Sequence, residues 1–433
     1  MQLQRHKVNY PLTGAQVREI KQRMLNWANQ FSILLFLDSN HYPSAYDGYE
    51  CLLAVGATEV VGGHEHDLLA QLQQRHNANP DWLFGHICYD YKNVLEPKLE
   101  SAHAAKTGFE LLQFFVPQTV CYINKEQTFL TIESFEDTNA IYNAIIDVDL
   151  ESVQKRIPHL QFTPVVDKAD YLATIERLRT HIADGDCYEI NYCTEGYCEG
   201  AEIDPLQVFN ALNGLSPAPF AAYYRSGAQY MMCSSPERYL KKQGSKVLSQ
   251  PIKGTARRDK DSETDAQIKN ALRNDIKERA ENVMIVDLVR NDLARCCETG
   301  SVQADELFGI YSFPQVHQMI STVSGTLKAA LPFTEAIRYS FPMGSMTGAP
   351  KYKVMQLTDR YERSRRELYA GTVGYITPGG DFDFNVVIRS MFYNEDTRYL
   401  TYQTGGAITY DSVPEQEWDE MRLKAWALER IFA

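Results

Sequence analysis

The sequence predicts a protein of the α+β class, with helices and mostly antiparallel strands formed by separate stretches of one chain. Apolar residues recur at helical spacing in residues 13–31 and again after Asp170. Short apolar runs between turn-forming residues predict strands, and residues 111–132 predict two strands joined as a hairpin. With 433 residues, of which 44% are hydrophobic, the chain can bury a sizeable core.

The first part of the chain, residues 1–165, combines one helix with several strands and carries no dense cluster of chemically active side chains. Its boundary is expected in residues 158–166, which are polar and contain two prolines. Its helix is predicted by the spacing of Val17, Ile20, Met24, Trp27 and Phe31. Besides the hairpin, its predicted strands are Ile33–Leu37, Val55–Gly63 and Trp82–Tyr91.

The second part, residues 166–433, begins with an amphipathic helix that we expect Asp170 to cap. A turn then leads into further predicted strands. The apolar face of the helix consists of Tyr171, Ile175, Leu178 and Ile182. The strands are Cys187–Thr194, Tyr230–Ser234, Lys246–Gln250, Tyr369–Ile376 and Asn385–Met391.

The composition excludes several classes of function. A net charge of −13 argues against nucleic acid as a partner, because phosphate binding requires a basic surface. An anionic substrate would need a metal ion or a local group of basic side chains. We find no long apolar run and no signal sequence, so we expect no membrane association and a cytoplasmic location. Nine scattered cysteines without CxxC pairs predict reduced thiols rather than zinc ligands.

The segment Pro251–Thr255, with the sequence Pro-Ile-Lys-Gly-Thr, is a candidate for catalysis. Gly254 lets the backbone approach a ligand, and Thr255 adds a hydroxyl donor. Lys253 can act as a nucleophile only in its uncharged form, and a free lysine has a pKa of about 10.4. Its activation therefore requires desolvation or nearby positive charge worth about 4 kcal/mol. The alternative at this point is an ordinary basic surface turn.

Two predicted helices each carry a pair of glutamates three residues apart, which places both carboxylates on one face. Four converging carboxylates need a cation, and ligands that are all oxygen favour Mg²⁺. The alternative, that each pair lies on a solvated helix face, stays open. The pairs are Glu278 and Glu281, in a helix of residues 261–293, and Glu417 and Glu420, in a helix that begins at residues 412–414 and also carries Lys424.

Six motifs, in this order along the chain, resemble those of the chorismate-binding enzymes, a family that includes anthranilate, aminodeoxychorismate, isochorismate and salicylate synthases. The resemblance covers residues 166–433 densely and the first part only in outline. It implies two large, mostly antiparallel sheets packed together with helices outside, the site between them, and strands contributed by residues 1–165. The motifs are Ser-Pro-Glu-Arg (235–238), Pro-Ile-Lys-Gly-Thr (251–255), Glu-Asn-Val-Met-Ile-Val-Asp-Leu-Val-Arg-Asn-Asp (281–292), Gly-Ala-Pro-Lys (348–351), Tyr-Ala-Gly-Thr-Val-Gly-Tyr (369–375) and Glu-x-x-Glu-x-x-x-Lys (417–424).

Within that family, Lys253 resembles the aminodeoxychorismate branch, since anthranilate synthases typically have alanine there. The resemblance implies that the amine attacks C2 of chorismate as the C4 hydroxyl leaves, which gives a covalent intermediate. Ammonia then enters at C4 and expels the lysine, and the product is 4-amino-4-deoxychorismate, a precursor of p-aminobenzoate and folate. Glu237 would be the general acid for the departing hydroxyl, so its pKa should be raised.

The resemblance also implies the remaining binding residues. Glu281 and Glu420 would ligate Mg²⁺ directly, with Glu278 and Glu417 nearby, and the metal would bridge to the ring carboxylate. The residues expected to hold the enolpyruvyl carboxylate are Tyr369, Arg389 and Lys424. Those expected to line the pocket are Gly254, Thr255, Thr347 and Gly405, together with His317, for which a core-packed role stays open.

The chain departs from the family pattern at two positions. Glu189 stands where the amidotransferase-linked members usually have glutamine, and Ala407 replaces a glycine. The first departure argues against the isochorismate and salicylate synthases, which have lysine there. Three alternatives stay open: an anthranilate synthase with an unusual lysine, an inactive chorismate-binding regulator, and a Schiff-base aldolase that uses Lys253.

None of the nine cysteines lies in a Gly-x-Cys-x-Gly nucleophile elbow. The resemblance to amidotransferase-linked enzymes therefore implies that ammonia comes from a separate glutamine amidotransferase subunit. The predicted partners of this chain are accordingly chorismate and a glutaminase, with no nucleic acid and no membrane.

Overall fold

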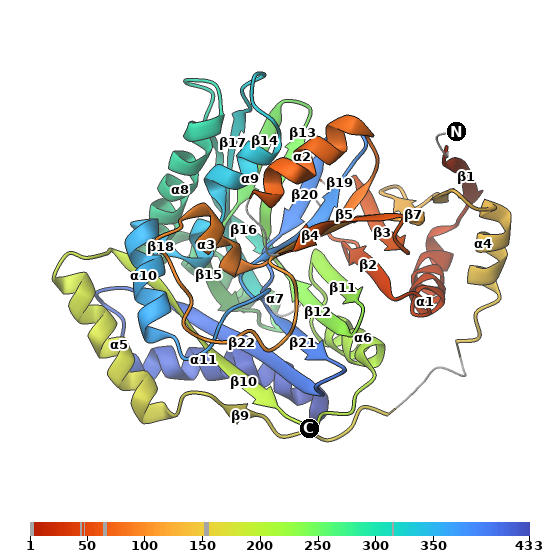
Figure 1. Ribbon diagram of the computed structural model, residues 1–433. Coiled ribbons are helices and arrows are strands. Elements are labelled where there is room, and N and C mark those ends of the chain that lie inside the picture. The colour runs from red at the N-terminus through yellow and green to blue at the C-terminus, as the bar shows by residue number, and fades with distance from the viewer. Residues whose placement is uncertain (1–3, 44–45, 47, 64–66, 151–155, 314–315) are drawn as a thin grey trace.

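Two large antiparallel sheets lie against each other in the computed structural model of the protein (Figure 1). The structure describes residues 1–433 except 1–3, 44–45, 47, 64–66, 151–155 and 314–315. One sheet has twelve strands and the other has ten, and all the strand pairs described are antiparallel. The predicted α+β fold with two large, mostly antiparallel sheets and flanking helices is confirmed.

The twelve-stranded sheet draws on both parts of the chain. Its order is β1-β8-β7-β3-β2-β11-β12-β21-β22-β10-β18, and β9 pairs with β10 beside this path. Its strands are β1 (His6–Pro11), β2 (Ile33–Asp38), β3 (Tyr49–Val55), β7 (Thr119–Asn124), β8 (Phe129–Ser134), β9 (Thr163–Pro164), β10 (Glu189–Cys198), β11 (Phe220–Ser226), β12 (Gln229–Ser235), β18 (Gly348–Ala349), β21 (Ser390–Asn394) and β22 (Tyr399–Ile408).

The ten-stranded sheet also combines early and late segments. Its order is β15-β17-β14-β13-β20-β19-β5-β6-β4, and β16 pairs with the second edge of β17. Its strands are β4 (Glu59–Gly63), β5 (Leu83–Ile87), β6 (Leu112–Val116), β13 (Arg238–Gln243), β14 (Lys246–Gln250), β15 (Ile252–Arg257), β16 (Gln303–Ser312), β17 (Val316–Thr326), β19 (Thr372–Ile376) and β20 (Phe382–Asn385).

Eleven α-helices and four short 3₁₀ helices are described. In Figure 1, α1 and α4 lie at one end of the molecule beside the early strands, and α5, α10 and α11 lie at the other. The α-helices are α1 (Val17–Ala28), α2 (Leu68–Ala78), α3 (Lys92–Leu95), α4 (Thr138–Ile146), α5 (Lys168–Ala183), α6 (Pro205–Leu215), α7 (Ser262–Asn274), α8 (Ile276–Cys296), α9 (Thr334–Ser340), α10 (Lys351–Tyr361) and α11 (Pro414–Glu429). The 3₁₀ helices are η1 (Gly14–Gln16), η2 (Tyr89–Tyr91), η3 (Gly344–Met346) and η4 (Arg430–Phe432).

Alternation along the strands explains how two cores form. On β2, Leu35 points into the core between the sheets, where it joins Phe84 and Phe114 of the ten-stranded sheet. Its neighbours Leu34 and Phe36 point to the opposite face and belong to the core that helices α1 and α6 cover. Because successive side chains of a strand face opposite sides, β2 packs on both faces, which explains why its sequence Ile-Leu-Leu-Phe-Leu-Asp is apolar up to its last residue.

Several of the predicted boundaries are wrong. The strand predicted at Asn385–Met391 is mostly the connection between β20, which ends at Asn385, and β21, which begins at Ser390. The helix α5 is capped by Asp167, whose side chain accepts a hydrogen bond from the backbone N–H of Asp170, so it begins three residues earlier than predicted. Residues 111–132 contribute to three strands, β6, β7 and β8, rather than two. The predicted helix of residues 261–293 is broken at Asp275, whose side chain caps α8 by accepting from the N–H of Glu278.

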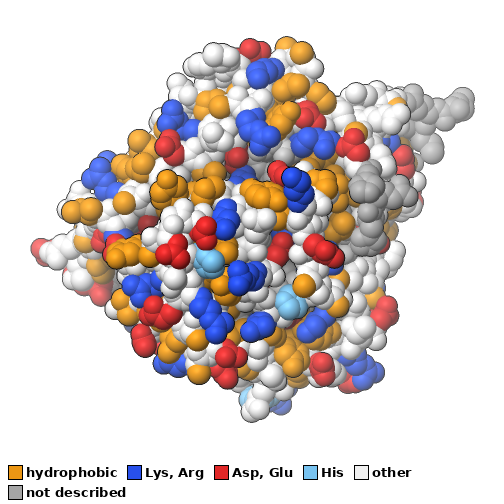
Figure 2. Space-filling model, turned by 60° about the vertical axis from the view of Figure 1, so that its left-hand side comes forward, with side chains coloured by type: hydrophobic (Ala, Val, Ile, Leu, Met, Phe, Trp, Pro, Cys, Tyr) orange, Lys and Arg blue, Asp and Glu red, His pale blue; other side chains and the backbone are white. Residues whose placement is uncertain are grey.

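Charged side chains of both signs are mixed on the surface that Figure 2 shows, so the negative net charge is not gathered there into one acidic patch. Among the helices that the structure describes, none is both long and apolar enough to cross a bilayer.

Candidate active site

A β-bulge in β15 sets the direction of the Lys253 side chain. Ile252 pairs with Ile320 and Thr255 with Gln318, so the two residues between them on β15 oppose a single residue of β17. A bulge of this kind interrupts the ladder and redirects a side chain. Gly254 supplies the required backbone conformation, with φ of +89°, which residues with a side chain rarely adopt. The Pro-Ile-Lys-Gly-Thr motif is therefore a strand that bulges at its lysine.

The Lys253 amine forms an ion pair with Glu189, the first residue of β10 in the other sheet. The side chain of Lys253 is 10% exposed and that of Glu189 is 1% exposed. Burial lowers the pKa of Lys253, but the carboxylates of Glu189, Glu281 and Glu237 outweigh it and hold the pKa above its usual value. The ion pair with Glu189 therefore favours the charged form of the amine, whereas the sequence-based expectation was an uncharged one.

Glu237 follows strand β12 and is buried. Burial raises the pKa of its carboxyl group to about 7, and hydrogen bonding to Ser345 and the charges of Lys253 and Arg389 only partly oppose this shift. A carboxylic acid that keeps its proton near neutral pH and lies beside the lysine is suited to general acid catalysis. The raised pKa matches what the proposed role of Glu237 requires.

Replacement of the Glu237 carboxyl group should lower the activity of the enzyme but raise its stability at alkaline pH. The rate of the wild-type enzyme should fall as the pH rises through about 7, because the acid loses its proton. A carboxyl pKa raised by folding contributes stability below its unfolded value and loses it as the pH rises through the folded value. Glu237→Gln should therefore slow the reaction about 100-fold or more, yet raise the free energy of unfolding relative to wild type by about 3 kcal/mol at pH 8.

Denaturant unfolding of both proteins at pH 5 and pH 8 measures this difference. A stability difference that is the same at both pH values would show that Glu237 does not titrate in this range. Ser245→Ala, at the turn between β13 and β14, is a control that should leave both quantities unchanged.

Arg389 immediately precedes β21 and is partly buried. Within the described part of the chain, its guanidinium group has no ion-pair or hydrogen-bond partner. Burial lowers the pKa of Arg389, and the nearby charge of Glu237 partly opposes this effect. An arginine desolvated without a partner is costly, and a bound carboxylate would offset that cost with bidentate hydrogen bonds.

The four glutamates of the predicted metal site lie on the two helices expected, α8 and α11. Burial raises the pKa of Glu281 to about 7, and the pKa values of Glu278 and Glu417 are also raised, first by burial and then by neighbouring carboxylates. Lys424 instead lowers the pKa of Glu420, with which it forms an ion pair of 2.8 Å. The charge of Glu420 acts on Glu278, so the two helices bring their carboxylates toward one another.

These side chains do not yet form a coordination shell. Within the described residues, no group of three or more His, Cys, Asp or Glu side chains is arranged to hold a metal ion. The donor set nevertheless suits Mg²⁺, since it consists of carboxylates from two helices, and a divalent ion favours their charged form. Lys277 and Lys424 contribute positive charge at this place, 3.8 Å from Glu281 and 2.8 Å from Glu420 respectively.

The remaining predicted site residues divide into two groups. Lys424 donates to the backbone oxygen of Gly405 at 2.8 Å, and a Cβ at Gly405 would lie 2.3 Å from the backbone oxygen of Tyr192, so only glycine fits there. Tyr369 and Thr347 are buried, Tyr369 beside Cys193 and Thr347 with its hydroxyl bonded within its own loop.

His317 and Thr255 are less suited to substrate contact. His317 is buried, with one ring nitrogen 3.0 Å from Asp265 and the other 2.9 Å from the Ser312 hydroxyl. Both nitrogens are therefore occupied, which favours the core-packed alternative for this residue. The side chain of Thr255 is exposed on β15.

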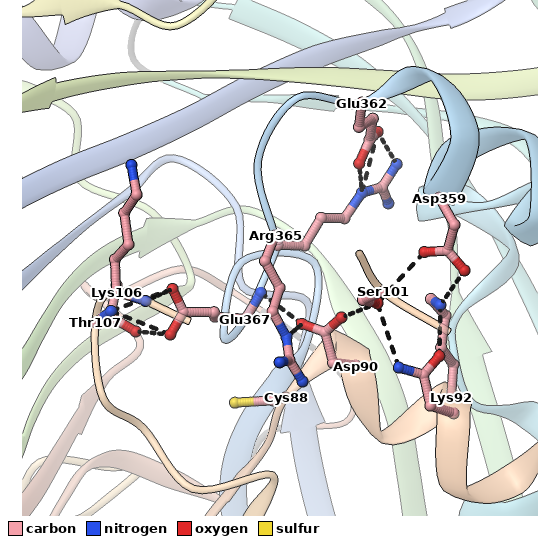
Figure 3. Close-up of polar contacts among 12 residues, drawn as sticks. Cys88, Asp90, Lys92, Ser101, Lys106, Thr107, Asp359, Glu362, Arg365 and Glu367 are labelled. Carbon is pink, nitrogen blue, oxygen red and sulfur yellow. Dashed lines mark hydrogen bonds and ion pairs between the residues drawn. The ribbon is translucent and has the colours of Figure 1, made fainter. Parts of the chain in front are cut away.

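A buried polar network beside this region was not predicted from the sequence. Figure 3 shows the segment that carries Asp90 and Thr107 joined to residues 359–367 by hydrogen bonds and ion pairs. Arg366 extends the network to the site: it binds Glu362 and donates to the backbone oxygens of Asn191 on β10 and Met346 in η3. The only sequence signal is the dense run of charges at 359–367, which usually marks a solvated surface.

Comparison with known proteins finds several relatives of this chain. A curated relative is the aminodeoxychorismate synthase of Arabidopsis thaliana, 40% identical over 269 residues, or 61% of this chain and 29% of the relative. Aminodeoxychorismate synthase component 1 of Bacillus subtilis is 35% identical over 59% of this chain and 54% of its own length. The match thus spans about half or less of these relatives.

The fold is shared with a solved structure, anthranilate synthase component I from Streptococcus pneumoniae. The TM-score is 0.77, with 23% sequence identity over 90% of this chain and 94% of the other. The sequence profile of the chorismate binding enzymes matches residues 33–430, which is most of the chain. The protein is therefore a member of the chorismate binding enzyme family.

Proposed function

We propose that the chain is the large subunit of an aminodeoxychorismate synthase, which converts chorismate and ammonia to 4-amino-4-deoxychorismate for p-aminobenzoate synthesis. The observation that carries this proposal is the position of Lys253 on the bulge of β15. Its amine lies near Glu237, whose raised pKa favours the protonated form, and near the carboxylates of Glu189 and Glu281. The names of the relatives support the same reaction.

Two side chains carry out the exchange at the ring. The Lys253 amine forms a bond to C2 of chorismate, the C1=C2 double bond moves to C1=C6, the C5=C6 double bond moves to C4=C5, and the C4–O bond breaks. Glu237 gives its proton to the departing hydroxyl, which leaves as water. Ammonia then forms a bond to C4, the C2–N bond breaks, and Glu237 regains a proton from the new ammonium group. Splitting one displacement into two is the general advantage of a covalent intermediate.

The substrate carries two carboxylates, and the site offers two kinds of partner for them. Arg389, which has no ion-pair or hydrogen-bond partner for its guanidinium group among the described residues, would take the enolpyruvyl carboxylate, together with Tyr369 and Lys424 as the family resemblance implies. Glu281 and Glu420, with Glu278 and Glu417 nearby, would hold Mg²⁺. When bound, the ion would neutralise these carboxylates and the ring carboxylate of the substrate.

Ammonia would come from a separate glutamine amidotransferase subunit. Some relatives are named component 1, which implies a second component. None of the cysteines lies in the nucleophile elbow of a glutaminase.

Product identity tests the proposal. We expect incubation with chorismate, Mg²⁺ and ammonium to yield 4-amino-4-deoxychorismate, which becomes p-aminobenzoate only after a separate lyase is added. Fluorescent anthranilate formed without the lyase would instead favour the anthranilate synthase alternative, which the component I structure of Streptococcus pneumoniae represents. No turnover at any ammonium concentration would favour an inactive chorismate-binding regulator.

A further inference from the structure

Lys253 is held as a charged ammonium group in this site, so a nucleophilic role requires a group that removes its proton. The charges of five carboxylates, which come from four different elements, interact with the charge of the amine. Among the residues that the structure describes, Glu189 alone forms an ion pair with it. The groups are Glu189 at the start of β10, Glu237 after β12, Glu278 and Glu281 on α8, and Glu420 on α11.

Glu189 differs from the other four in what surrounds it. Its side chain is 1% exposed, and one carboxylate oxygen contacts the lysine amine. The second oxygen is buried and has no hydrogen-bond partner among the described residues. A buried carboxylate with one oxygen unpaired is poorly satisfied as an anion. Transfer of a proton from Lys253 converts the buried ion pair into a neutral amine and a neutral acid without changing the net charge.

From this contact, we propose that Glu189 is the general base that takes a proton from Lys253 before the amine attacks chorismate. The inference rests on the proposed function, in which Lys253 is the nucleophile. One N–H bond of the lysine breaks, one O–H bond forms on Glu189, and the freed electron pair of the amine forms the bond to C2. When ammonia expels the lysine, Glu189 returns the proton and both groups regain their starting charges.

The competing interpretation is that Glu189 only holds Lys253 in place as a fixed counter-ion. The two roles predict opposite effects of Glu189→Gln, which preserves size and still accepts a hydrogen bond. Removal of the negative charge lowers the pKa of Lys253, so more of the amine is uncharged at neutral pH. A counter-ion alone therefore predicts an unchanged or faster reaction, whereas a lost base predicts a slower one.

The experiment measures kcat of wild type and Glu189→Gln with saturating chorismate, Mg²⁺ and ammonium, between about pH 6 and about pH 10. We expect Glu189→Gln to be about 100-fold slower or more at neutral pH, and to recover as the pH rises because solvent then removes the proton. A rate equal to or above that of wild type would overturn the proposal.

A second measurement, the chemical reactivity of the Lys253 amine, distinguishes a change in the pKa of Lys253 from a loss of the catalytic base. Acetic anhydride modifies uncharged amines, and peptide mass spectrometry reports the modification of Lys253 in the enzyme without chorismate. We expect Lys253 to react faster in Glu189→Gln than in wild type although turnover is slower. Slower modification would show that the amine itself has been displaced, and would overturn the proposal.

Two controls complete the design. Glu195→Gln removes another buried carboxylate of β10, which bonds Tyr399 and Thr401 rather than Lys253, and should keep the wild-type pH profile. Lys253→Ala tests the proposed function in the same assay. If Lys253→Ala retains the wild-type rate, the covalent step itself is wrong. If Lys253→Ala is inactive while Glu189→Gln is fully active, only the role of Glu189 falls.

Discussion

Lys253→Ala should reduce the formation of 4-amino-4-deoxychorismate by about 10³-fold or more at ammonium concentrations that sustain the wild type. The variant loses the proposed nucleophile, and ammonia would have to displace the C4 hydroxyl without a covalent intermediate. Alanine is also the residue typical of anthranilate synthases at this position. A residual formation of anthranilate, detected by its fluorescence, would fit that interpretation.

The matched control is Lys246→Ala on the adjoining strand β14. That lysine is 49% exposed and pairs with Asp305 on the surface. We expect it to keep the wild-type rate, since exposed ion pairs contribute little. If Lys253→Ala were as active as Lys246→Ala, the covalent step would have to be abandoned.

Removal of Mg²⁺ should have an effect of similar size. Dialysis against a chelator should lower the rate by about 10³-fold or more, because neutralisation of the carboxylates is worth several kcal/mol. Added MgCl₂ should restore it. Glu281→Gln should weaken the activation by Mg²⁺, measured as a shift of the half-saturating concentration.

Asp287→Asn is the matched control on the same helix. Its side chain is 70% exposed and pairs with Arg290, so it should leave the Mg²⁺ titration unchanged. Full activity in the presence of the chelator would exclude the metal site that we propose on α8 and α11.

The fold class could be predicted because its evidence is local. Helical periodicity identified α1, and the length and apolar character of Ile33–Leu37 identified β2. The pairing of Glu278 with Glu281 and of Glu417 with Glu420 also follows from helix geometry alone. The errors in the helix boundaries arose where an N-cap residue determines the first residue of the helix, as at Asp167 and Asp275. Several acidic residues near each of these helix starts could have served as the cap.

The candidate site could be predicted only in part, because its contacts join distant segments. Glu189 and Lys253 lie in different sheets, and no pattern in either strand gives the position of one sheet over the other. The charged state of Lys253 follows from that contact, so it could not be predicted either. His317 illustrates the reverse case: its motif position suggested a pocket residue, whereas Asp265 and Ser312 occupy both of its nitrogens.

The most direct test of the central claim is a crystal structure of the protein with Mg²⁺ and chorismate, in the absence of ammonia. We predict that the amine nitrogen of Lys253 lies about 3 to 3.5 Å from C2 of the ring, or is bonded to it, with the ring carboxylate turned toward α8 and α11. A ring bound away from β15, with the Lys253 amine out of reach of C2, would contradict the account.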